Sequence, residues 1–118
     1  MPNIRSLLEE GLAVSGPEYT RCRWHQARLS REILQCFEGV DALFVPATTD
    51  PAPDASTTGD PAFNSPWSYT GLPVVSFPIG LAPDGLPLAV QLVGRPFGEV
   101  GLFRVAAWCA VVLQRSGA

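Results

Sequence analysis

The chain has 118 residues, 47% of them hydrophobic and 16% charged, with a formal net charge of −3, which fits one domain with a modest core. The acidic balance argues against a nucleic-acid partner, which calls for a basic patch, and no run of about 18 apolar residues offers a membrane span. The start of the chain lacks the apolar core of a signal peptide, so a cytoplasmic protein is expected.

Two helices are predicted in the first part of the chain. Apolar residues at helical spacing predict a short helix over 4–14. A longer helix over 17–38 has Pro17 at its first position and Gly39 as its C-terminal stop. Residues 1–40 are therefore expected to be helical.

The remainder of the chain alternates apolar runs with turns. A short apolar run over 41–46 predicts a buried strand, and a stretch rich in Pro, Asp and Thr over 47–70 predicts a long loop. Two apolar runs within 73–94 flank a Pro-Asp-Gly turn and predict an antiparallel hairpin. The last predicted element is a helix over 98–114, in which residues 105–113 are all apolar, so every face of it is expected to be buried.

This order of elements predicts a single α/β domain in which helices pack on a small mixed sheet of about three strands. A domain of this size covers one face of the terminal helix with its own sheet. The large side chains of Phe103 and Trp108 are therefore expected to pack against another chain. A homodimer is the simplest such assembly, because a two-fold axis lets one patch cover itself.

The inventory of reactive residues limits the chemistry of the chain. All eight basic residues are arginine, and without lysine there is no Schiff-base chemistry, no Walker A loop and no lysine general base. Cys22, Cys36 and Cys109 have no CxxC spacing and predict reduced thiols rather than disulfides or a zinc site. A catalytic pair of Cys22 with the single histidine, His25, is the alternative. We predict no metal and no cofactor.

Several segments in order resemble a known family. They are Asp41 to Thr48 (DALFVPAT), Thr58 to Ser68 (TGDPAFNSPWS), Thr70 to Pro73 (TGLP), Phe77 to Gly80 (FPIG) and Gly85 to Gly94 (GLPLAVQLVG). Each segment is weak alone, but together and at this spacing they resemble the amidase signature family. The resemblance implies that the chain corresponds to the C-terminal quarter of such an enzyme and is a fragment of its α/β fold.

The resemblance also implies what the chain lacks. Members of the amidase signature family hydrolyse or transfer amides with a Ser-cis-Ser-Lys triad, and this sequence contains neither adjacent serines nor a lysine. We therefore assign no catalytic residue and expect activity on a small carboxamide only in an enzyme completed by an upstream amidase fragment. The alternative is a non-catalytic remnant or interaction module that self-associates or complements a partner chain.

The long loop holds the candidate substrate residues. In the related enzymes this loop helps to line the substrate cleft, so the resemblance implies substrate contacts from Asp60, Asn64 and Trp67. The carboxylates of Asp50, Asp54 and Asp60 could instead bind a hard cation, but their spacing is not that of an EF-hand loop and they fit solvated turn residues. For the aromatic side chains of this stretch, packing is the alternative to ligand contact.

Overall fold

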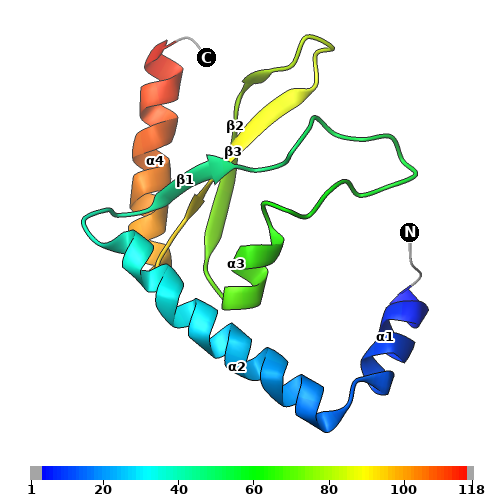
Figure 1. Ribbon diagram of the computed structural model, residues 1–118. Coiled ribbons are helices and arrows are strands. Elements are labelled where there is room, and N and C mark those ends of the chain that lie inside the picture. The colour runs from blue at the N-terminus through cyan, green and yellow to red at the C-terminus, as the bar shows by residue number, and fades with distance from the viewer. Residues whose placement is uncertain (1–3, 117–118) are drawn as a thin grey trace.

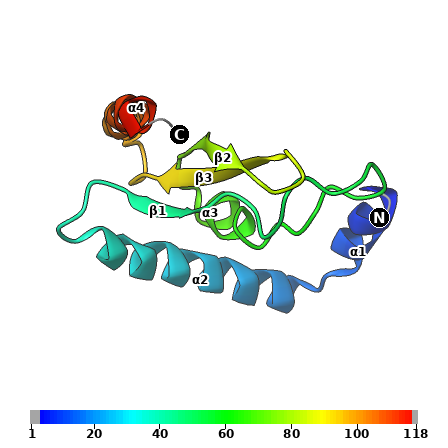
Figure 2. The ribbon, with the colours of Figure 1, turned by 90° about the horizontal axis from the view of Figure 1, so that it is seen from above.

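Three layers make up the computed structural model of the chain, which describes residues 4–116 (Figure 1). Helix α2 (Gly16–Glu32) lies on one face of a three-stranded sheet, and helix α4 (Glu99–Ser116) lies on the other, as the view from above shows (Figure 2). The molecule is a thin slab with principal extents of 54 × 39 × 18 Å. The expected α/β class, with helices packed on about three strands, is confirmed.

The N-terminal helices begin and end at the residues that carry the sequence signals. Helix α1 covers Ile4–Ala13, and α2 begins after Ser15, whose Oγ accepts a hydrogen bond from the backbone N–H of Glu18 at 3.3 Å. The long helix predicted over 17–38 is α-helical only to Glu32. Its last part is a 3₁₀ turn, η1 (Ile33–Phe37), because the chain tightens there before leaving the helix at the left-handed Gly39.

The sheet has the order β1-β3-β2, with β1 at Leu43–Pro46, β2 at Val74–Leu81 and β3 at Pro87–Val93. Both pairings are antiparallel, and Val93 lies opposite Leu43 on one side and Val74 on the other. The predicted hairpin is therefore confirmed. The sheet is antiparallel throughout rather than mixed, because β3 lies between the two strands that run in the same direction.

A short helix interrupts the segment predicted to be loop over 47–70. Helix α3 covers Ser65–Thr70, with Pro66 in its first turn, and it ends where the N–H of the left-handed Gly71 donates to the carbonyl oxygen of Trp67. Proline near the start and glycine just past the end are typical helix boundaries. Six residues are too few to show helical periodicity, so this helix was missed.

The core lies between the sheet and the helices of the α2 side. Its buried cluster consists of Phe37, Leu72 and Val93. Partly buried apolar side chains pack against this cluster, namely Ile33, Leu43, Val45 and Trp67. The residues of this core come from η1, the turn after α3, and the strands, so it holds the α2 layer against the sheet.

The C-terminal helix packs on β2 and β3 through one side. Leu102 is only 3% exposed and lies so close to Gly94 that a Cβ added there would come within 3.2 Å of it. Phe103 and Trp108, by contrast, are 62% and 67% exposed, so the expectation that every face of α4 is buried fails within this chain. Within residues 4–116, no helix has the length and apolar character needed to cross a membrane.

Candidate functional site

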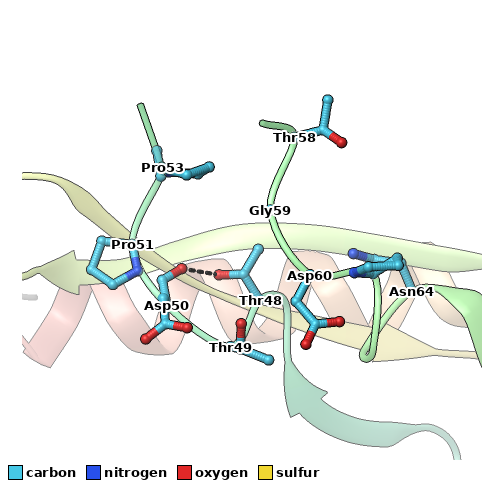
Figure 3. Close-up of a pocket in the computed structure, with 11 residues that line it drawn as sticks. Thr48, Thr49, Asp50, Pro51, Pro53, Thr58, Gly59, Asp60 and Asn64 are labelled. Carbon is cyan, nitrogen blue, oxygen red and sulfur yellow. Dashed lines mark hydrogen bonds between the residues drawn. The ribbon is translucent and has the colours of Figure 1, made fainter. Parts of the chain in front are cut away.

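A pocket of about 280 Å³ lies in the loop that joins β1 to α3 (Figure 3). Its lining comes from two stretches of the loop, 48–53 and 58–61, together with Asn64 just before α3. The expected substrate residues Asp60 and Asn64 are both in this lining. The pocket is thus formed by one segment of the chain and placed at the end of the central sheet.

Local hydrogen bonds of short polar side chains shape this loop. The hydroxyl of Thr48 donates to the carbonyl oxygen of Asp50 at 2.8 Å, and the backbone N–H of Ala62 donates to Asp60 Oδ1 at 2.9 Å. Such turns of Asp and Thr side chains onto the nearby backbone replace the hydrogen bonds of regular structure. They explain how a loop rich in proline holds an enclosed shape.

The polar groups of the pocket are two carboxylates, several hydroxyls and one amide. Asp50 and Asp60 both line it, with Thr49 drawn between their carboxylates in Figure 3. Asn64 uses its side-chain Nδ2 to donate to the carbonyl oxygen of Ala47 at 3.3 Å, which ties the start of α3 to the end of β1. The lining therefore offers both acceptors and donors to a small polar ligand.

The third carboxylate of the loop, Asp54, is not among the residues that line the pocket. Hydrogen bonds from the side chain and the backbone of Ser56 lower the pKa of Asp54, and the backbone N–H of Ser56 lies 2.7 Å from its Oδ1. Its carboxylate is therefore engaged in the turn itself. Across residues 4–116, no group of three or more His, Cys, Asp or Glu side chains is arranged to hold a metal ion.

Trp67, the remaining expected substrate residue, lies outside the pocket lining. It packs against the core cluster of Phe37, Leu72 and Val93. Its indole Nε1 is buried and has no hydrogen-bond partner among the described residues. The structure therefore places Trp67 in packing that supports α3, and a substrate contact from it stays a prediction.

Sequence analysis missed the residue that anchors the pocket loop. Gln91, on β3, is 1% exposed, and its Nε2 donates to the carbonyl oxygens of Pro46 at 3.0 Å and Phe63 at 2.6 Å. These two carbonyls stand at either end of the loop, so one buried amide holds both ends. A single polar residue inside the apolar run LAVQLV was the available signal, because a buried polar side chain needs partners.

The residues of the alternative cysteine–histidine pair lie in a different part of the structure, between α2 and α3. The Tyr69 hydroxyl donates to the backbone carbonyl oxygen of Cys22 at 3.0 Å and lies 3.2 Å from His25 Nδ1. Gln26 adds a hydrogen bond from its Nε2 to the carbonyl oxygen of Tyr69 at 2.6 Å. The atom of Cys22 in this network is its carbonyl oxygen, so these contacts attach two helices and do not pair a thiol with a base.

Comparisons with known proteins identify the class. The model of the Amidase family matches residues 9–103, and the chain belongs to this family. A solved amidase superposes with a TM-score of 0.83 at 25% identity, over 94% of this chain and 28% of its own.

Two relatives carry a more specific name. A subunit of the glutamyl-tRNA(Gln) amidotransferase of Bartonella tribocorum is 38% identical over 99 residues, which cover 75% of this chain and 20% of that protein. The structure of the Thermotoga maritima protein of the same name matches with a TM-score of 0.60 at 25% identity, over 86% of this chain and 25% of its own. The chain thus spans about a fifth of the length of the curated relatives it matches.

Proposed function

We propose that this chain is the C-terminal, substrate-side portion of an amidase-type amidohydrolase or amidotransferase. The observation that carries the proposal is the pocket in the 48–64 loop, which lies inside the segment matched by the Amidase family. The relatives are an amidase and amidotransferase subunits, all much longer than this chain. The reaction assigned to the completed enzyme is cleavage of an amide C–N bond.

The chemistry of the pocket fits a small carboxamide. A carboxamide has N–H donors and a carbonyl acceptor, and Asp60 supplies an acceptor while the Asn64 amide and the Thr48 and Thr49 hydroxyls supply both kinds of group. We assign substrate contact to Asp60 and Asn64. Trp67 supports them by fixing α3 against the core.

The chain is proposed to be inactive by itself. The family's nucleophile and base are serines and a lysine, and this sequence has no lysine and no adjacent serines. Removing the members of such a unit costs orders of magnitude in rate, because they act together. The three cysteines of the described residues are free thiols, which accords with a proposed place in the reducing cytoplasm.

The test compares the chain alone with a completed enzyme. The chain alone should release ammonia from simple carboxamides no faster than buffer. A fusion in which it replaces the matching segment of the Bartonella tribocorum protein, assayed with the other subunits of that enzyme, should be active. In the fusion, Asp60→Ala should raise KM about tenfold or more, while Asp54→Ala, outside the pocket lining, should leave KM unchanged. Equal effects of the two substitutions would contradict the assignment.

A second function, that of a non-catalytic interaction module, is favoured by the apolar side chains that this fold leaves exposed. Leu8 and Leu12 on α1, and Phe103 and Trp108 on α4, are each more than half exposed. Exposed apolar patches of this kind mark interaction sites. A stable homodimer at micromolar concentration, together with an inactive fusion, would support this function over the first.

A further inference from the structure

The face of the sheet beneath α4 is bare at its β1 end. Leu43 and Val45 pack towards the core cluster on the α2 side, so strand alternation puts Phe44 on the α4 side. The main packing of α4 is on β2 and β3, and Phe44 remains 60% exposed. A large aromatic side chain therefore lies next to the helix layer without being covered by it (Figure 2).

Two adjacent hollows lie between α4 and the turn before β1, and Asp41 lines both of them. The first, of about 280 Å³, reaches Gly101, and the second, of about 430 Å³, reaches Val105 and Trp108. Gly101, Val105 and Trp108 follow one another at helical spacing and so form one stripe of α4. A Cβ added at Gly101 would meet nothing within 4 Å, so the helix backbone is open to close approach. Asp41, Phe44 and these three residues are here named the β1–α4 recess.

The shape of the chain indicates what covers the recess. Its radius of gyration is 17.4 Å, whereas a compact domain of this length has about 13.5 Å. The same arrangement, with a TM-score of 0.83, occurs in an amidase of which this chain covers 28%. A flat segment that keeps its shape within a larger fold is covered by the remainder of that fold.

The distribution of the exposed apolar residues argues against a second copy as the occupant. Every residue of α1 is at least partly exposed, and Leu12 is 87% exposed. Helix α1 lies at the opposite end of α2 from the recess in both views (Figures 1 and 2). A two-fold dimer through one patch would leave the other bare, whereas a larger partner can reach both.

We propose that the β1–α4 recess is the docking surface for the catalytic portion of an amidase fold, which enters it with an apolar helix or strand. The identity of this partner rests on the proposed function. The location of the surface rests on Phe44, the Gly101 stripe and the two hollows. Docking there would bury Trp108 and Phe44, the two largest side chains of the recess.

The experiment uses a substitution that fills the recess without disturbing the chain. The tagged chain is co-expressed with the Bartonella tribocorum protein shortened by the segment that this chain matches, both as separate chains and as a direct fusion. The unmodified chain should retain the shortened protein on the affinity resin, and Gly101→Phe should retain at least tenfold less. The matched control is Ala27→Phe, at an exposed position of α2, which should retain the normal amount. Circular dichroism should give the same helix content and melting temperature for the two variants.

Three results would overturn the proposal. The first is equal retention by Gly101→Phe and the unmodified chain. The second is absence of retention together with a fusion that melts no higher than the chain alone. The third is a dimer of this chain that Gly101→Phe dissociates, which would assign the recess to a second copy. Amide hydrolysis is read separately, because retention without hydrolysis contradicts the proposed function and leaves the docking surface standing.

Discussion

The side-chain amide of Gln91 donates to the carbonyl oxygen of Phe63 at 2.6 Å and so joins the central strand to the far end of the pocket loop. The same nitrogen donates to Pro46, where that loop begins. A buried amide with both donors used is rigid, because losing either bond leaves a polar group without water or partner. The pocket thus depends on a residue that does not line it.

We expect Gln91→Leu to lower the free energy of unfolding by about 1–3 kcal/mol, because the shape of the side chain is kept while two carbonyl oxygens lose their donor. Urea denaturation followed by tryptophan fluorescence measures the change. Gln35→Leu, at an exposed position of η1, is the control and should alter stability by less than about 0.5 kcal/mol. A similar loss in both variants would contradict the role given to Gln91.

Two glycines should respond to alanine in opposite ways. At Gly94 the new Cβ would come within 3.2 Å of Leu102 and 3.4 Å of Pro73, so Gly94→Ala should destabilise the fold by about 1–3 kcal/mol. At Gly101, inside α4, it would meet nothing within 4 Å, and Gly101→Ala should stabilise the helix by up to about 1 kcal/mol. Thermal melts of both variants beside the unmodified chain decide this. Matching shifts in the same direction would show the packing of α4 on the sheet to be wrong.

The hydroxyl of Tyr69 should contribute to the attachment of α3 to α2. Tyr69→Phe removes its hydrogen bonds to the Cys22 carbonyl oxygen and His25 and should cost about 0.5–1.5 kcal/mol. Tyr19→Phe, on an exposed side of α2, should cost nothing measurable. Hydrogen exchange of the α3 amides gives a local readout, and exchange that is unchanged in Tyr69→Phe would contradict the attachment.

The turn around Asp54 should give a local pH dependence. Its pKa is lowered in the folded chain from an ordinary value of 3.8, so the stability contributed by this turn is present above that value and is lost as the pH falls through the folded pKa. Ser56→Ala removes the side-chain hydrogen bond, the larger of the two causes, and should move the pKa of Asp54 back up towards 3.8. Titration of the Asp54 carboxyl carbon by NMR measures this. An unshifted value in the variant would show that the Ser56 hydroxyl is not the cause.

The sequence determined the elements that depend on local chemistry. The Pro-Asp-Gly turn between two apolar runs was enough for the hairpin, because turn geometry and side-chain alternation act over a few residues. Ser15, Pro17 and Gly39 marked the ends of the helical region for the same reason. The family was also within reach, because ordered motifs over residues 41–94 carry it, and the family match confirms it.

Tertiary structure alone decided the features that depend on residues far apart in the chain. No local signal tells that β3 lies in the middle of the sheet or that Gln91 reaches both Pro46 and Phe63. Burial settles whether a tryptophan supports the core, as Trp67 does, or stays exposed, as Trp108 does, and both lie in apolar surroundings in the sequence. Hydrophobic burial has no direction of its own, so the side of a helix that is covered is decided by which other segments pack against it.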